Sequence, residues 1–166
     1  LMGCLVTVFN YISYHLLEAP FQLSQSWIGL ISIAYLAGIY SSSKAAQWSF
    51  KYGRAKVLPL MLLMMMAGLL ITLIPALWAI LLGLIIFAFA FFAAHSTASS
   101  WVSVQAIQYR AVAASLYLFC YYIGSSLLGS SGGLIWENFG WVGINLSVGL
   151  VLAVGLFLTF YLHDAK

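Results

Sequence analysis

Residues 77–102 read LWAILLGLIIFAFAFFAAHSTASSWV, and this stretch decides the fold class. It contains no Asp, Glu, Lys or Arg, and about 20 mostly apolar residues suffice for a helix to cross a bilayer. The rest of the 166-residue chain is similar, because 64% of its residues are hydrophobic, 5% are charged and the mean hydropathy is +1.07. Soluble domains carry roughly 25% charged residues. The composition excludes a soluble fold and predicts an all-α integral membrane protein.

Six transmembrane helices fit the pattern of apolar stretches and breaks. The breaks contain Pro20, Gly53, Pro75 and Gly140, which are typical of turns between helices. The predicted spans lie at roughly 1–17, 27–48, 57–75, 77–102, 112–135 and 142–162. Because Leu1 already lies in an apolar stretch, we expect the chain to be part of a longer protein.

The basic residues predict the orientation of these spans. When the loops are numbered alternately, all Lys and Arg residues fall at ends that share one side: Lys44, Lys51, Arg54, Lys56, Arg110 and Lys166. Lys and Arg mark cytoplasmic loops, so both ends of the chain are predicted to be cytoplasmic. Four tryptophans gather at the opposite boundary, where their rings favour the headgroup layer: Trp27, Trp78, Trp136 and Trp141.

The six spans differ in polarity. The third and sixth are almost wholly apolar and suit a position facing lipid, whereas the others carry polar and small residues that favour protein or water. This pattern predicts two units of three helices, the arrangement from which transporter halves are built.

In the first span, Thr7, Asn10 and Tyr14 recur at helical spacing. Two interpretations stay open for this face: a polar wall along a solute path, or a single hydrogen bond from Asn10 to a neighbouring helix. In the second span Gly38 belongs to a small-residue packing face, and Tyr35 is the side chain expected to reach a cavity.

His95 is the candidate functional residue of the fourth span. An ionisable side chain inside a membrane costs free energy, and such residues therefore mark functional sites by default. His95 could carry a proton, or it could remain neutral and hydrogen-bonded. In the fifth span, Tyr117 and Tyr121 lie on a stripe that suits a cavity wall. Three glycines of the same span suit close helix packing or a hinge: Gly124, Gly129 and Gly132.

A protease must also be considered, since residues 129–132 read GSSG and resemble the G-x-S-G of six-span rhomboid proteases. Ser131 would need a His within hydrogen-bond reach. His95 and His163 are predicted near the other membrane face, and the order of spans does not match that family, so this is a remote alternative.

Residues 46–56, AQWSFKYGRAK, resemble the second copy of the cytoplasmic motif G-x-x-x-D-x-x-G-R-x-[KR] of the major facilitator superfamily. Gly53, Arg54 and the basic ending match, while Ala46 and Phe50 replace the motif's glycine and acidic residue. Further fragments that resemble bacterial members of the superfamily are FNYI at 9–12, FFAAHS at 91–96, SLYLF at 115–119 and YYIGSS at 121–126.

The resemblance implies helices seven to twelve of a twelve-helix transporter, the C-terminal half, in a bacterial inner membrane. It implies proton-coupled export of a small organic solute by alternating access, with the absent N-terminal half as partner. By this correspondence the cavity candidates are Asn10, Tyr14, Tyr35, His95, Tyr117 and Tyr121. The cytoplasmic gate would comprise Lys51, Gly53 and Arg54.

No embedded carboxylate is predicted, because Glu18, Glu137 and Asp164 all fall outside the span centres. A coupling carboxylate would therefore belong to the other half, unless a His serves. We expect no enzymatic activity, cofactor, metal or nucleic-acid partner. The alternative from another class is a self-contained six-span protein that forms a homo-oligomeric channel or a membrane scaffold.

Overall fold

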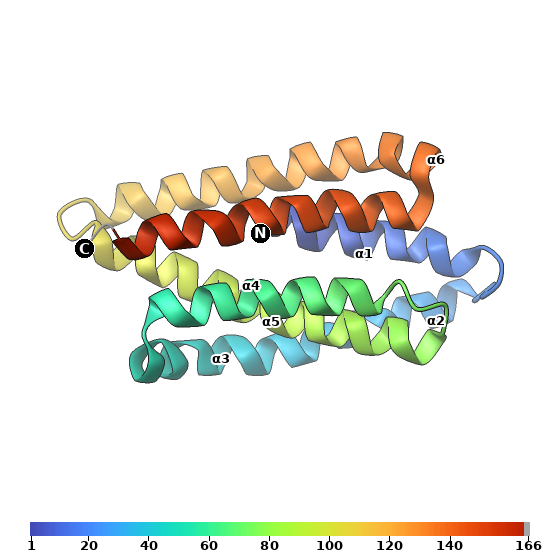
Figure 1. Ribbon diagram of the computed structural model, residues 1–166, viewed down its shortest axis with the longest axis horizontal. Helices are drawn as coiled ribbons and strands as arrows, with labels where there is room; N and C mark the ends of the chain where they lie inside the picture. The colour runs from blue at the N-terminus through green and yellow to red at the C-terminus, as the bar shows by residue number, and fades with distance from the viewer. Residues whose placement is uncertain (165–166) are drawn as a thin grey trace.

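The computed structural model describes residues 1–164, with the side chains described up to Tyr161. It is an antiparallel bundle of long helices (Figure 1). Lys166, which contributed to the predicted topology, lies outside the described residues, and so do the side chains of His163 and Asp164.

The first half of the chain forms three long helical segments. Helix α1 spans Met2–Leu17. Helix α2 (Gln25–Leu30), the short 3₁₀ turn η1 (Ile31–Ile33) and α3 (Ala34–Tyr52) follow one another with helical backbone angles at both junctions, so they form one continuous rod. Helix α4 spans Arg54–Ile71. The rod is longer than the predicted second span, and α4 ends before the predicted limit at residue 75.

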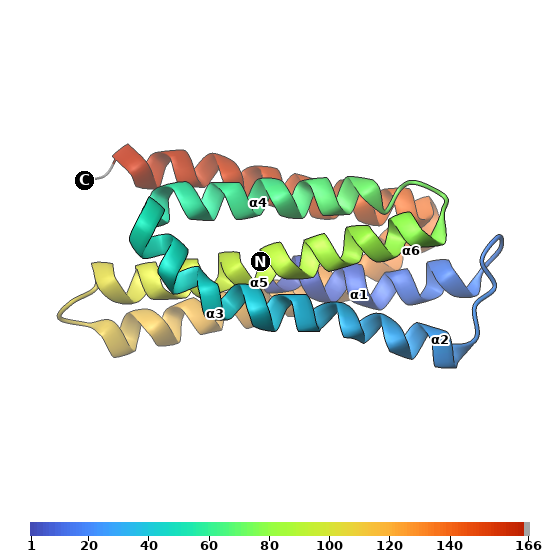
Figure 2. The ribbon, with the colours of Figure 1, turned by 90° about the horizontal axis from the view of Figure 1, so that it is seen from below.

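The second half contains α5, Leu77–Gln105, and α6, Arg110–Asp164. Helix α6 is divided at Gly140, where φ is +57° and ψ is −150°, so two antiparallel arms meet there. These backbone angles are accessible almost only to glycine. The arms correspond to the predicted fifth and sixth spans, and Figures 1 and 2 show them running back along each other.

Helix α5 lies at the centre of the bundle. It packs against α3 and α4, while α1 packs against α6. Its buried side chains include Ile80, Leu84, Phe87 and Phe91. Large apolar residues are exposed on α4 and on the second arm of α6, for example Leu63 and Leu150. Others are equally exposed on α3 and on the first arm, for example Leu36 and Leu116, so exposure alone does not separate the spans predicted to face lipid from the rest.

Three helices of the described chain are long and apolar enough to cross a membrane: α4, α5 and α6 over Arg110–Tyr161. Helix α1 is apolar but shorter. Every regular element of the described residues is helical, and three of these helices are candidate spans.

The connections separate the charges into two groups. The α3–α4 and α5–α6 connections lie at one end of the bundle, and the α1–α2, α4–α5 and Gly140 connections lie at the other (Figure 1). Glu18 follows α1 at the second end, and Glu137 precedes Gly140 there. Lys51, Lys56 and Arg110 lie at the first end.

Candidate functional site

A small pocket lies between α5 and the first arm of α6, around His95. Its volume is about 300 Å³. The residues that line it are His95, Ser99, Ser100, Ser103, Ala114, Tyr117 and Leu118. Three serines and an imidazole from one face of α5 thus meet a phenol from α6, which makes this pocket a candidate for recognising a polar solute.

His95 is held by one hydrogen bond and by aromatic rings. Its Nδ1 lies 2.8 Å from the hydroxyl of Tyr117, and its ring centroid lies 4.6 Å from that of Tyr121. The ring of Phe91 lies nearly parallel to the imidazole, with centroids 6.1 Å apart. Since the Tyr117 hydroxyl engages Nδ1, Nε2 is the imidazole nitrogen left for a solute.

The serines of the pocket have their hydroxyl protons engaged within α5. Ser99 donates to the carbonyl of Ser96, Ser100 to that of Thr97, and Ser103 to that of Ser99. Each hydroxyl oxygen keeps acceptor capacity after donating its proton. The pocket therefore presents acceptor oxygens to a solute that carries N–H or O–H donors.

An aromatic path leads from His95 toward α3 and α1. Phe92 packs edge-on to Phe91 and Tyr35, with centroid distances of 5.1 and 6.0 Å. Tyr35 in turn stacks on Phe9 at 4.6 Å. The structure thus connects Tyr35 with His95, Tyr117 and Tyr121 through phenylalanines that the sequence analysis did not single out, because Phe is common in apolar helices.

Asn10 and Tyr14 lie apart from this group. Asn10 is exposed on α1, and Tyr14 is 54% exposed. Tyr14 belongs to a second aromatic group, in which its ring lies 6.0 Å from Tyr11 and 6.1 Å from Trp136. These two candidates mark a neighbouring surface formed by α1 and α6.

Lys51, Gly53 and Arg54 do not form a loop. Lys51 belongs to α3 and Arg54 begins α4, so Gly53 alone joins the two helices, with φ +84°. Arg54 Nε donates to Ser100 Oγ at 3.4 Å, and Ser100 lines the His95 pocket. The turn is thus linked directly to the wall of the pocket.

The predicted packing glycines occupy different environments. A methyl group at position 38 would overlap the ring of Phe92, and one at position 132 would overlap Tyr11. The carbonyl of Gly129 accepts a hydrogen bond from the Tyr11 hydroxyl at 3.2 Å. Gly124 has open space at its own Cβ position, yet its carbonyl lies where a side chain at Gly3 would fall.

A buried cluster of polar side chains lies at the end of the bundle opposite Lys51, Lys56 and Arg110. The sequence analysis did not predict it. The indole nitrogen of Trp141 donates to the carbonyl of Thr72 at 3.1 Å, and Asn145 Nδ2 donates to the carbonyl of Trp141 at 3.0 Å. The Thr72 hydroxyl lies 3.4 Å from Asn145 Oδ1. His15 stacks on Trp141 with centroids 5.4 Å apart. An isolated Asn in an apolar stretch was the only sequence signal for this group.

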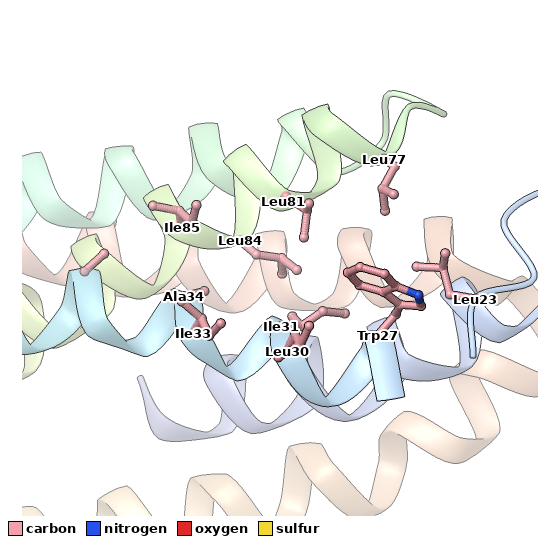
Figure 3. Close-up of a pocket in the computed structure, with 11 residues that line it drawn as sticks. Leu23, Trp27, Leu30, Ile31, Ile33, Ala34, Leu77, Leu81, Leu84 and Ile85 are labelled. Atoms are coloured by element: carbon pink, nitrogen blue, oxygen red, sulfur yellow. The ribbon is translucent and has the colours of Figure 1, made fainter. Parts of the chain in front are cut away.

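A larger cavity than the His95 pocket is apolar and lies elsewhere. It has a volume of about 520 Å³ between α5 and the α2–α3 rod. Figure 3 shows Trp27 of α2 and Leu81 and Leu84 of α5 pointing into this space. It offers a solute almost no polar contact, so we regard the smaller His95 pocket as the candidate site.

Ser131 does not have the surroundings of a nucleophile. Its exposed hydroxyl donates to the carbonyl of Leu128 at 3.3 Å, while His95 pairs with Tyr117 and His15 packs on Trp141. Within the part of the chain that the structure describes, no group of three His, Cys, Asp or Glu side chains could hold a metal ion.

Known proteins with similar sequences are transporters and not enzymes. The chain is 46% identical to the inner membrane transport protein YnfM of Escherichia coli over 163 residues, which cover 98% of the chain and 39% of YnfM. It is 42% identical to the uncharacterised MFS-type transporter YybF of Bacillus subtilis over 98% of the chain and 40% of YybF. An uncharacterised transporter of Buchnera aphidicola subsp. Schizaphis graminum is 46% identical over 98% of the chain.

The chain spans about 40% of the length of these relatives. No protein-family model and no solved structure matches it. The aligned regions cover nearly the whole chain, which confirms the resemblance to the major facilitator superfamily. The chain is therefore homologous, along its whole length, to part of the MFS-type transporters.

Proposed function

We propose that the chain is the C-terminal, six-helix half of a secondary active transporter that works by alternating access. The six spans would be α1, the α2–α3 rod, α4, α5 and the two arms of α6. The homology to MFS-type transporters supports the class, and the chain's 40% share of their length supports a missing half. The observation that carries the proposal is the His95–Tyr117 pair in a polar pocket between two long apolar helices.

The chemistry of the pocket supports a small organic solute without strong negative charge. Arg54 contacts the pocket only through its hydrogen bond to Ser100, and no Lys or Arg lines the pocket itself. The hydroxyl oxygens of Ser99 and Ser103 act as acceptors toward a donor-bearing solute. The rings of Tyr117 and Tyr121 provide stacking surfaces beside them. Proton coupling and export are proposals that rest on the family resemblance, and the coupling carboxylate would lie in the other half.

The α3–α4 turn would act as part of the cytoplasmic gate. Arg54 donates a hydrogen bond to Ser100 in the wall of the pocket. A movement of the turn would therefore displace Ser100 and change the shape of the pocket. In this proposal the protein lies in a bacterial inner membrane, with the end of the bundle that carries Lys51, Lys56 and Arg110 in the cytoplasm. The N-terminal end of the chain lies about midway along the bundle in Figures 1 and 2, so α1 as described does not reach the cytoplasmic end that the sequence predicted for it.

The experiment uses the full-length gene product, purified in detergent, and a panel of small organic solutes with neutral, weakly basic and strongly anionic members. Solutes that raise its melting temperature would be measured again with Tyr117→Phe, which removes only the hydroxyl that engages His95. Without this hydroxyl the imidazole is no longer held with Nε2 available to the solute. A hydrogen bond from the solute to Nε2 would contribute about 0.5–1.5 kcal/mol, so we expect solute affinity to fall roughly two- to tenfold.

Tyr122→Phe is the matched control, because Tyr122 is 60% exposed on the same helix and does not line the pocket. It should bind the solute as the unaltered protein does. If both variants bind equally, or if every stabilising solute is a strong anion, the proposed site is wrong.

A further inference from the structure

A groove separate from the His95 pocket lies where α3, α4 and α5 meet. It opens toward the end of the bundle that carries Lys51, Lys56 and Arg110, here called the basic end. Its volume is about 430 Å³. Trp48 and Tyr52 of α3, Leu60 and Met61 of α4, and Phe89 of α5 form its walls together with Lys56. The rings of Trp48 and Phe89 lie 5.9 Å apart across the seam between α3 and α5. Apart from Lys56 the walls are almost wholly hydrocarbon and aromatic.

This groove faces away from the His95 pocket. Along an α-helix each residue turns by about 100°, so Trp48 and Tyr35 lie about 140° apart around α3. By the same spacing Phe89 and His95 lie about 120° apart around α5. A partner half that covers the aromatic path of the site would therefore leave this groove open to the bilayer.

The charge around the groove is positive. Lys56 lines it, and Lys44 and Lys51 lie four residues before and three residues after Trp48, on the same side of α3. Lys51 Nζ lies 5.1 Å from the centroid of the Tyr52 ring. The two described carboxylate side chains, Glu18 and Glu137, belong to the opposite end of the bundle. The lysines thus have no described acidic partner at this end.

We propose that this groove is a binding site for an anionic phospholipid, with an acyl chain between α3, α4 and α5 and the phosphate at Lys56 and the neighbouring lysines. Long Lys side chains place their stems along apolar surface and their charge at the interface. Basic pockets between transmembrane helices on the cytoplasmic side suit anionic headgroups. A soluble anion would leave the apolar walls uncovered, and a zwitterionic lipid would bring its own positive charge to the lysines.

The test measures quenching of Trp48 by brominated lipids in the full-length gene product reconstituted into vesicles. Phosphatidylglycerol or phosphatidylcholine would carry bromine on its acyl chains at equal mole fractions, and Trp48→Phe would identify the contribution of Trp48. Because one lysine near the surface favours an anionic lipid about fivefold, we expect stronger quenching by brominated phosphatidylglycerol.

Lys56→Gln should reduce this preference by about fivefold, the contribution of one lysine near the surface, and Lys56→Arg should keep it. Arg110→Gln is the matched control, since Arg110 begins α6 at the same end of the bundle but does not line the groove. Equal quenching by the two lipids in the unaltered protein would overturn the proposal without any need for a variant. Equal losses in Lys56→Gln and Arg110→Gln would also overturn it, because they would indicate diffuse attraction without a site. Neither outcome bears on the His95 pocket.

Discussion

Asn145 fixes the start of the second arm of α6 to the end of α4. It is 4% exposed, and its amide lies between the carbonyl of Trp141 and the hydroxyl of Thr72. The Thr72 hydroxyl has a shorter bond, 2.6 Å, to the carbonyl of Leu69, so the contact with Asn145 is the weaker of its two. In an apolar core the amide is tolerated because both of its polar atoms have partners.

We expect Asn145→Leu to destabilise the protein by about 0.6–1.7 kcal/mol, which are the average and the maximum measured for polar contacts between membrane helices. The loss stays small because Leu is similar in size and the bond from Trp141 to Thr72 remains. Unfolding by titration with SDS would measure it. The matched control is Asn138→Leu, since Asn138 is exposed and donates only to Leu134 of its own helix. A loss in Asn138→Leu as large as that in Asn145→Leu would contradict the assignment.

These residues also show what sequence reasoning can reach at this scale. His95, Tyr117 and Tyr121 could be singled out because polar side chains are conspicuous in apolar helices, and the structure brings them together. Asn145 lies in a stretch interpreted as facing lipid, and only its contact with another helix reveals its role. Asn10 was equally conspicuous in sequence, yet it lies exposed on α1. Polarity predicts that a residue needs a partner but does not identify the partner.

At the scale of helices, breaks were easier to predict than lengths. Gly53 and Gly140 both have positive φ and both end a helix near the predicted positions. The composition around residues 25–26 and 49–52 is too polar to predict membrane helix, yet the α2–α3 rod includes both ends. Backbone hydrogen bonding continues the helix past the apolar stretch, so hydrophobicity alone underestimates its length.

Gly38 sets the approach of α3 to α5, because the ring of Phe92 occupies the space that a side chain would need. We expect Gly38→Ala to destabilise the bundle by about 1–3 kcal/mol, the usual cost of overpacking. The displaced Phe92 ring would also lose its contact with Tyr35, so solute binding should weaken. Thermal unfolding and the solute assay would measure the two effects.

Gly29→Ala provides the control for the helix propensity of alanine, because the space at its Cβ position is open. It should leave stability unchanged or raise it by up to about 1 kcal/mol. If Gly38→Ala also proves neutral, the close approach of α3 and α5 does not depend on this glycine.

At the scale of the whole molecule, the separation of charge relates the fold to the membrane. The alternation of loops in the sequence predicted that the basic residues share one end of the bundle. The structure places Lys56 and Arg110 at one end and Glu18 and Glu137 at the other. The sequence could predict this because antiparallel helices with short connections alternate in direction. It could not predict how α5 comes to lie between α3 and α4, which depends on the packing of side chains such as Phe87 and Phe91.

The orientation of the bundle can be measured by thiol labelling, and both functional proposals depend on it in different ways. In the full-length gene product with all cysteines replaced, Cys4 and Cys120 among them, Ser24→Cys should react with a membrane-impermeant maleimide in intact spheroplasts. Gln108→Cys, in the connection between α5 and α6, should react only after permeabilisation. The reverse pattern would invert the bundle and place the Lys56 groove in the outer leaflet. The His95 pocket would keep its contacts under either outcome, because it lies between α5 and α6 and not at a membrane surface, so only the proposed gate and the leaflet of the lipid would change.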